Sequence, residues 1–387
     1  MKIGFTGDIA FSEYTKDVYK QPKSLDKKIY SFLNENDYNI LNFESPITES
    51  NLTKKAALTH KSSSETLDYV KKNINNPILS LANNHMMDFG QRGLLDTLKA
   101  VKKEKLPFLG AGKNEEEATK YLILGKDIKV GVVAVQYKDY MIATKDEPGT
   151  AHHKHFKIIQ NRIKDLKEKA DWVVMVYHGG EEFINTPLPY TRKLYKKFLK
   201  WGVDIVVAHH PHTVQGYEKV GKKMIFYSLG NFIFDTDFQR AQYGTDEGVL
   251  ISLEFTKDSY SFEPLLLKRD RDENKLNVIE RNIHFKDIAK KYGKEWKKEA
   301  RRLKNITEKK KELKKYRNQF LINNLYIEKA QINNMCSFDE LVEKYYGKDL
   351  DEKPEFKHTN KIIRKFRRLK KANYKKFICM KIASIFR

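Results

Sequence analysis

Short apolar runs that end in polar clusters recur through the first 240 residues of the chain. Runs of strand length and composition occur at 2–7 (KIGFTG), 37–43 (DYNILNF), 77–82 (PILSLA), 119–125, 128–136, 171–177, 203–208, 223–229 and 247–256. Helices are expected at 155–170, at 190–201 and at 91–104, where Leu94, Leu95, Leu98 and Val101 share one face. This alternation of strands and helices predicts an α/β layered fold.

The polar residues that follow these runs are candidates for one shared site. The candidate metal ligands are Asp8, Glu44, Asn84, His178, His210 and His212. Because ligand sites of open α/β sheets lie outside the carboxyl ends of strands, we expect these residues to converge in space. Carboxylate, amide and imidazole donors suit Mn, Fe, Zn or Mg better than a thiolate site would. Six such donors suffice for two divalent ions about 3.5–4 Å apart, the arrangement that clamps both oxygens of an in-line phosphoryl displacement.

Two neighbouring residues suggest proton transfer beside the metal ligands. His85 follows Asn84 directly, and its imidazole could protonate a leaving oxygen or bind phosphate. Asp88 could hold that imidazole in one tautomer. We therefore assign His85 and Asp88 catalytic roles.

The His210–Pro211–His212 segment has a spacing that can place both imidazoles on one side. Residues i and i+2 of an extended segment point the same way. Pro211 favours the extended form for the residue before it. We therefore predict an extended segment here.

Three further polar residues are assigned to substrate binding: Asn83, Glu181 and Asn231. Glu181 and its neighbour Glu182 follow a double glycine, and either could face the site or be solvated. Asn231 could instead cap a turn, and Gly230 before it would allow a close backbone approach.

Charge and composition limit the partners. The net charge of +23, from 74 Lys and Arg against 51 Asp and Glu, favours an anionic phosphorylated or polymeric substrate. A lysine-rich genome is the alternative explanation, because lysine is spread along the whole chain. Two cysteines, Cys336 and Cys379, make neither a disulfide framework nor a CxxC metal site. Nucleic-acid binding is not expected, because no recognised module is present.

The character of the chain changes after residue 268. We predict a main domain over 1–268, a charged helical extension over 269–353 and a basic amphipathic tail over 354–387. Residues 356–387 carry 12 Lys or Arg and no Asp or Glu, which suits peripheral contact with an anionic membrane. The alternative is a solvated helix packed on the main domain. Neither a secretory signal nor an 18-residue apolar span is found, so the expected location is cytoplasmic, peripheral at the inner membrane face where the tail binds.

Several motifs together resemble the CapA-type family of capsule (poly-gamma-glutamate) synthesis proteins, a branch of the calcineurin-like metallophosphoesterases. They are GDIAF at 7–11, NFES at 42–45, LANNHMMDFG at 81–90, HGGEE at 178–182, AHHPHTVQGYE at 208–218 and YSLGNFIFD at 227–235. The resemblance covers about residues 2–240. It implies a two-sheet αββα metallophosphatase-like sandwich, here with an α-helical C-terminal extension.

The resemblance also implies roles for individual residues. Asp8 matches the metal-binding Asp of the first strand, and Glu44 stands where the superfamily has a bridging Asp. Asn84 and His85 match its Asn-His pair, His178 its single His, and His210 with His212 its HxH pair. The usual Asp-x-His motif is absent, because Ala10 stands in place of the second ligand. The chain could therefore hold one ion, or two of unequal affinity.

Two functions of different classes follow. The first is a metal-dependent phosphoesterase-like hydrolase that acts in capsule or cell-envelope polymer synthesis, on poly-gamma-glutamate or a polysaccharide. The alternative is a non-catalytic, membrane-associated assembly factor for a capsule polymer synthase.

Overall fold

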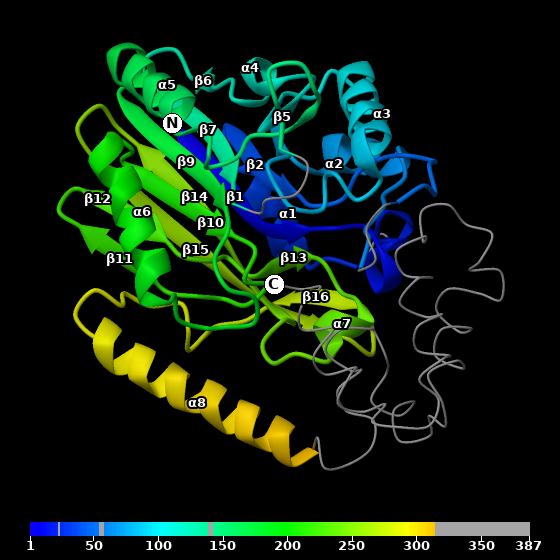
Figure 1. Cartoon of the computed structure of the whole chain (residues 1–387), viewed down its shortest axis with the longest axis vertical. Coiled ribbons are helices and arrows are strands. Elements are labelled where there is room, and N and C mark those ends of the chain that lie inside the picture. Colours follow the sequence, from blue (N-terminus) through cyan, green and yellow to red (C-terminus); the bar gives the residue numbers. More distant parts are fainter. Residues whose placement is uncertain (22–23, 54–57, 138–141, 314–387) are drawn as a thin grey trace, which may run out of the picture. The chain divides into compact units, whose positions relative to one another are not determined.

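The computed structural model describes residues 1–21, 24–53, 58–137 and 142–313 of the chain (Figure 1). Contacts divide the chain into two compact units, one of Met1–Ser50 with His60–Arg301 and the other of Asn51–Thr59 with Arg302–Arg387. The fold and the site described below belong to the first unit. The tail predicted at 354–387 and residues 314–353 of the predicted helical extension lie outside the described residues.

The larger sheet of the first unit combines parallel strands with an antiparallel meander. Its order is β16-β15-β14-β1-β2-β3-β4, and β13 pairs with β1. The strands are β1 (Lys2–Ile9), β2 (Tyr38–Phe43), β3 (Pro77–Ser80), β4 (Phe108–Leu109), β13 (Asn231–Ile233), β14 (Glu247–Phe255), β15 (Tyr260–Asp270) and β16 (Lys275–Val278). Because β1 to β4 run parallel, their carboxyl ends meet at one edge.

A second, mixed sheet has the order β11-β12-β10-β9-β7-β6. Its strands are β6 (Leu122–Leu124), β7 (Val130–Gln136), β9 (Trp172–His178), β10 (Ile205–His209), β11 (Tyr217–Val220) and β12 (Lys223–Phe226). The parallel strands β7, β9 and β10 again end side by side. A small ribbon pairs β5 (Ala111–Gly112) with β8 (Gly149–Thr150).

Helices cover the outer faces of both sheets. The helices of the described residues are α1 (Lys27–Asn34), α2 (Glu65–Asn73), α3 (Gly90–Lys103), α4 (Glu115–Ala118), α5 (Phe156–Lys169), α6 (Pro189–Trp201), α7 (Asp237–Arg240) and α8 (Tyr292–Leu313), with 3₁₀ turns η1 (Glu13–Thr15) and η2 (Val18–Lys20). No helix among the described residues is both long and apolar enough to cross a membrane.

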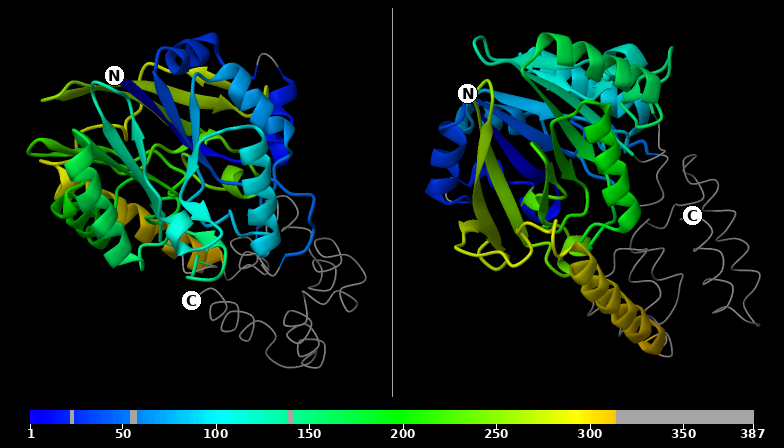
Figure 2. Two further views of the ribbon diagram at one scale, coloured as in Figure 1. Left: turned by 90° about the horizontal axis from the view of Figure 1, so that it is seen from above. Right: turned by 90° about the vertical axis from the view of Figure 1, so that its left-hand side faces the viewer.

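Three apolar clusters show the order of the layers. One, which includes Phe5 and Val174, fills the space between the two sheets (Figure 2). Another packs α1, α2 and α3 on the larger sheet, and the third packs α5 and α6 on the second sheet. The first unit is thus an α/β sandwich with αββα layers, which confirms the predicted fold class.

Two sequence expectations need correction. Leu94, Leu98 and Val101 of α3 are buried, but Leu95 is 37% exposed, because it lies one residue past the apolar stripe. The predicted domain boundary at residue 268 falls inside β15. The hairpin of β15 and β16 extends the sheet beyond it, and the unit continues to Arg301. The charged sequence KRDRDEN gave no strand signal for this hairpin. Strand β15 lies next to the edge strand β16, and most of its residues are exposed or half-buried.

Candidate metal centre

The six predicted metal ligands lie together at the carboxyl ends of strands from both sheets. Asp8 lies in β1, Glu44 follows β2, and Asn84 follows β3. His178 ends β9, and His210 and His212 follow β10. The centre therefore sits where the parallel strands of both sheets end, as expected of an α/β protein.

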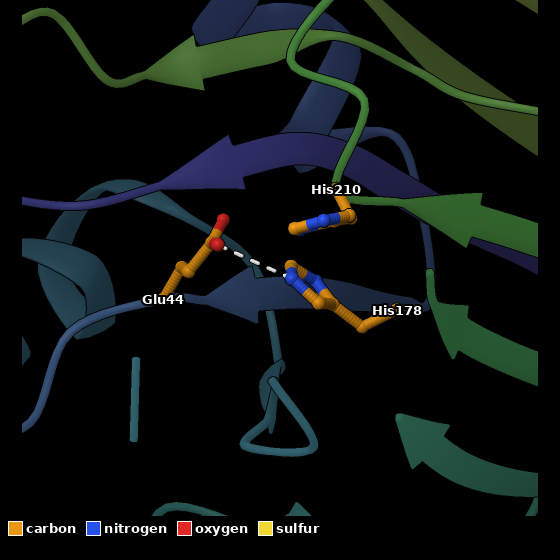
Figure 3. A group of neighbouring side chains, drawn as sticks. All are labelled: Glu44, His178 and His210. Atoms are coloured by element: carbon orange, nitrogen blue, oxygen red, sulfur yellow. Dashed lines mark ion pairs between the residues drawn. The ribbon is translucent and has the colours of Figure 1, made fainter. Parts of the chain in front are cut away.

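Glu44 links two groups of side chains that could each hold an ion. One group is Glu44, His178 and His210, and the other is Asp8, Glu44 and His212. In each group one donor atom per residue lies within 4.8 Å of the others, and all the residues are buried. Figure 3 shows the first group, in which Glu44 Oε1 lies 3.2 Å from His178 Nε2. Asn84 Oδ1 lies 2.7 Å from the same nitrogen, so Asn84 adds an oxygen donor to this group.

The Asp8 carboxylate contacts side chains from three other segments of the chain. Its Oδ2 lies 3.1 Å from His212 Nδ1, and its Oδ1 lies 3.2 Å from His209 Nδ1 and 2.8 Å from Asn42 Nδ2. Burial alone would raise the pKa of Asp8, but the hydrogen bonds from His209 and His212 outweigh it and hold this pKa well below its usual value. Asp8 is therefore ionised, as a metal ligand must be.

The pKa values of the two histidines that contact Asp8, His212 and His209, are shifted in opposite directions. Burial alone would lower the pKa of His212, but the charges of Glu44 and Asp8 raise it to about 9. Burial lowers the pKa of His209, and its contact with Asp8 does not fully offset that effect. In the metal-free protein His212 therefore carries the positive charge that balances the buried carboxylates.

Glycines bring Asp8 into position. Strand β1 continues through Asp8 to Ile9, past the end predicted for it at residue 7, and its register on β13 shifts between Asp8 and Ile9. The Asp8 amide donates to Gly230 O at 2.9 Å. A Cβ on Gly7 would lie 2.5 Å from Gly230 O, so the close approach requires glycine at residue 7. A Cβ on Gly230 would lie 2.6 Å from Glu247 O, so the close approach predicted there is observed, and its φ of 66° also favours glycine.

The His210–Pro211–His212 segment is a turn, which corrects the extended conformation predicted for it. His210 has φ of 97° and His212 has φ of 55°, both in the left-handed region. The imidazoles still converge, with ring centroids 5.8 Å apart. The His210 amide donates to Asp8 Oδ2 at 3.3 Å, which helps hold this strained backbone.

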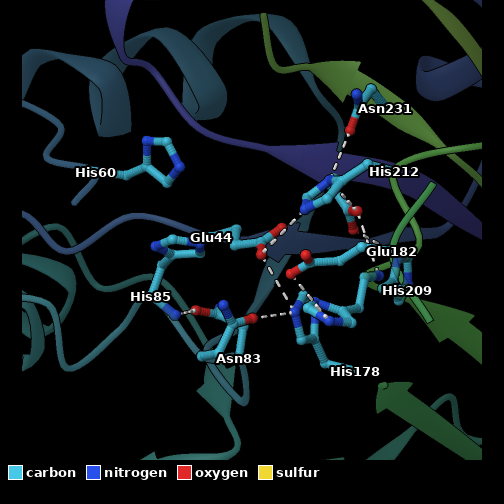
Figure 4. Close-up of polar contacts among 12 residues, drawn as sticks. Glu44, His60, Asn83, His85, His178, Glu182, His209, His212 and Asn231 are labelled. Carbon is cyan, nitrogen blue, oxygen red and sulfur yellow. Dashed lines mark hydrogen bonds and ion pairs between the residues drawn. The ribbon is translucent and has the colours of Figure 1, made fainter. Parts of the chain in front are cut away.

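His85 and Asp88 have the relation expected of an oriented proton donor. His85 Nδ1 lies 2.7 Å from Asp88 Oδ2, and the His60 amide donates to the same oxygen at 2.7 Å. The His60 ring lies beside His85, with centroids 4.3 Å apart. Asp88 is fully buried, so its charge is not screened by solvent. Figure 4 shows His85 beside Glu44, with His60 above it in the view.

The three residues predicted to bind substrate each make hydrogen bonds within the protein, and their predicted contact with a substrate stays a prediction. Asn83 donates to Phe43 O at 2.8 Å and accepts from two backbone amides of the 85–86 turn. Glu181 accepts from Thr191 Oγ1 at 2.6 Å, at the start of α6. Asn231 Oδ1 lies 3.0 Å from His212 Nδ1 and so orients that imidazole. Polar residues beside a site are as often needed to shape its loops as to bind its ligand.

Sequence reasoning missed several residues that contact the ligands. Asn42 Nδ2 lies 3.2 Å from His178 Nδ1 and also donates to Asp8, so one amide joins the two groups. Tyr137 and Glu182 both contact His210, and His209 contacts Asp8. The alternation along β2 could have indicated Asn42, which stands two residues before Glu44. No sequence signal separates His209 from its neighbours.

The donor set fits a divalent ion. Two ligand atoms about 2.1 Å from one ion lie at most about 4.2 Å apart, so the observed spacing needs only a small contraction. The donors are carboxylate, amide and imidazole, the mixture that Mn, Fe, Zn and Mg accept. Ala10 is fully buried and supplies no donor, so the group of Asp8 and His212 keeps three ligands, whereas Asn84 adds a fourth to that of His178 and His210.

Comparisons with known proteins agree with this picture. The family model described as bacterial capsule synthesis protein PGA_cap matches residues 2–236. The capsule biosynthesis protein CapA of Bacillus anthracis is 30% identical over 305 residues, which cover 75% of this chain and 73% of that protein. The PGA biosynthesis protein CapA of Bacillus subtilis is 32% identical over 249 residues, which cover 62% of this chain and 65% of that protein.

Among solved structures, similarity is found to a Staphylococcus aureus protein provisionally assigned as a 5′-nucleotidase, in complex with alpha-ketoglutarate. The TM-score is 0.41 at 17% identity, and the match covers 77% of this chain and 58% of that one. The chain thus spans less than two thirds of the nucleotidase and of the Bacillus subtilis relative.

Proposed function

The chain belongs to the bacterial capsule synthesis protein family, and on that premise we propose that it is a metal-dependent phosphoesterase that acts in the synthesis of a capsule or cell-envelope polymer. The observation that carries the proposal is the shared Glu44, which joins two buried groups of three donors each. A site of this kind suits displacement at phosphorus, where charge develops on both the entering and the leaving oxygen.

Different residues of the centre would have different roles in the reaction. A pair of divalent ions held by the two groups would supply Lewis-acid polarisation of the phosphoryl oxygens. His85 would donate a proton to the leaving oxygen, and Asp88 holds its Nδ1 at 2.7 Å so that Nε2 is the reacting nitrogen. The ligands are buried, so their charges act at low dielectric.

The proposed substrate is anionic, either a phosphorylated small molecule or a phosphorylated polymer. The names of the two Bacillus relatives place them in capsule and PGA biosynthesis, and the net charge of +23 suits such a polyanion. We extend this to a cytoplasmic protein that contacts an anionic membrane peripherally through residues 356–387.

One observation favours the alternative of a non-catalytic assembly factor. Ala10 removes a donor from the group that contains Asp8 and His212, and a centre with one strongly held ion could be purely structural. Metal content alone does not separate the two functions, because both retain the group of His178 and His210.

The test combines metal analysis with hydrolysis. The purified full chain is loaded with Mn or Zn, its ions are counted, and phosphomonoester and phosphodiester substrates are screened. The variants are His178→Ala, which removes a ligand, and His85→Gln, which keeps the ligands. His284→Gln, outside both groups, is the control. We expect hydrolysis to fall in the first two variants and bound metal to fall only in His178→Ala. A wild-type chain that binds metal yet hydrolyses no substrate would overturn the enzymatic proposal in favour of the assembly factor.

A further inference from the structure

The loop after β9 carries an acidic side chain, Glu182, that points toward the centre and has no role assigned to it so far. We propose that Glu182, with Tyr137, is a positioning residue that fixes the His210 imidazole so that Nδ1 faces the ion. This inference rests on the proposed metal centre and adds to it an outer partner for one ligand.

The contacts of His210 carry the first step. Glu182 Oε1 lies 3.4 Å from His210 Nε2, and Tyr137 Oη lies 3.3 Å from the same nitrogen. Two oxygens on one ring nitrogen suit a shared N–H donor, which leaves Nδ1 as the atom with a lone pair. A metal-binding histidine commonly donates its other N–H to a carboxylate, which fixes the tautomer and makes the ligand more basic.

The loop is built to deliver this carboxylate. Gly180 and Phe183, on either side of Glu181 and Glu182, have φ of 120° and 64°, so the chain turns sharply at both ends of the pair. The Phe183 amide donates to Pro211 O at 2.8 Å, which ties the loop to the segment that carries His210. Non-glycine residues in this region cost free energy and persist where surrounding structure holds them.

Glu182 also differs from the ligands in its exposure. Its side chain is 39% exposed, whereas the His210 side chain is fully buried. Figure 4 shows the Glu182 carboxylate directed into the centre, between Glu44 and the histidines of the second sheet. The carboxylate therefore reaches the buried ring from the solvent side. Burial, with the nearby charges of Glu182 and Glu181, raises the pKa of Tyr137, so its hydroxyl stays neutral beside His210.

The other two histidine ligands have amide partners. Asn42 Nδ2 lies 3.2 Å from His178 Nδ1, and Asn231 Oδ1 lies 3.0 Å from His212 Nδ1, which also lies 3.1 Å from Asp8 Oδ2. Glu182 differs from Asp8 because it is a carboxylate partner that is not itself a predicted ligand, and a carboxylate strengthens the electron donation of a ring because it carries a full charge. With Asn84 as a further donor, the group of His178 and His210 should bind its ion more tightly than that of Asp8 and His212.

Glu181 supplies a matched control. It neighbours Glu182 in sequence, but its carboxylate faces α6, where it accepts from Thr191 Oγ1 at 2.6 Å and from the Leu188 amide at 3.4 Å. Glu181→Gln keeps the acceptor oxygen for Thr191 Oγ1, the shorter of the two hydrogen bonds, and loses the second acceptor. A change at residue 181 thus has the same chemistry as one at 182 but leaves His210 untouched.

The experiment uses the full-length chain and zinc. Zinc affinity is measured by competition with a chelator for wild type, Glu182→Ala, Glu182→Gln and Glu181→Gln. We expect Glu182→Ala to weaken the tighter site by about 10–100-fold. Glu182→Gln should lose less, because its amide oxygen still accepts, and Glu181→Gln should match wild type.

Nitrogen-15 NMR of the histidine rings in the zinc-loaded protein gives the second readout, with the His210 signals assigned from His210→Gln. We expect a proton on Nε2 and zinc on Nδ1. Zinc on Nε2, or equal affinity in all variants, would overturn this inference and leave the centre intact. A wild-type chain that binds no zinc would instead remove the centre, and this inference with it.

Discussion

Replacing Glu44 by glutamine should sharply reduce the stabilisation that a bound ion gives the fold. Glu44 Oε1 lies 3.2 Å from His178 Nε2 and 3.9 Å from His212 Nε2, so one carboxylate serves both groups. Glutamine has nearly the same size but lacks the charge, and it offers a single weak donor. Both groups therefore lose a charged ligand at once.

The expected magnitude follows from mass action. An ion present at about 1,000 times its dissociation constant stabilises the folded chain by about 4.1 kcal/mol. If the loss of the bridging charge weakens binding by about 100-fold, the same ion concentration gives only about 1.4 kcal/mol. At about 2 °C per kcal/mol, a value suited to a large domain, the metal-induced rise in Tm falls from about 8 °C to about 3 °C.

Differential scanning calorimetry with and without Mn or Zn measures this rise for each protein against its own metal-free form. Glu254→Gln, an exposed residue of β14, is the control and should behave as wild type. A Glu44→Gln chain whose Tm rises as much as that of wild type would refute the bridging role.

Three other outcomes are expected. The His212 pKa of about 9 lies above its unfolded value of about 6.5, so the charge of His212 stabilises the fold fully below about pH 6.5, and this contribution is lost as pH rises through 9. Because zinc competes with the proton on His212, zinc titrations should show affinity rising over this pH range. The His212→Gln variant should show no such rise. Glu218→Ala should lower the free energy of unfolding in urea by about 3 kcal/mol, because the buried carboxylate accepts from Arg192 at 2.7 Å and from Tyr227 at 2.8 Å. Gly230→Ala should lower both the free energy of unfolding and the metal affinity, since its Cβ would lie 2.6 Å from Glu247 O beside the strand that carries Asp8. An unchanged value of either quantity would show that the close approach at Gly230 does not position Asp8.

The pattern of apolar runs was enough to predict the α/β class, because buried strands are recognisable as short apolar segments. It also predicted that the metal ligands lie close together, because the carboxyl ends of parallel strands share one edge of a sheet. Side-chain direction was not predictable in the same way. Asn83 and Glu181 have the chemistry of substrate-binding residues, yet their hydrogen bonds close the local loops. Only the fold determines whether a polar side chain turns inward to a backbone group or outward to a ligand.

Backbone conformation was the second limit. Pro211 restricts its predecessor, and the sequence therefore predicts an extended His210, but its φ is 97°. The contact of the His210 amide with Asp8, more than 200 residues away in the chain, outweighs that local preference. The role of Glu182 stayed open and that of His209 was missed for a related reason, since each is adjacent to a residue of the same type and only the three-dimensional structure separates the two neighbours.

The ligands are divided evenly between the two sheets, and this division sets the order of events during synthesis. Asp8, Glu44 and Asn84 come from the larger sheet, and the three histidines come from the second sheet and the turn that follows it. A growing chain that has not yet reached residue 178 has no histidine ligand to offer, and neither sheet alone can hold an ion in full coordination. An ion held by both groups would therefore bind after the two sheets have packed together, and it would stabilise a finished fold without nucleating it.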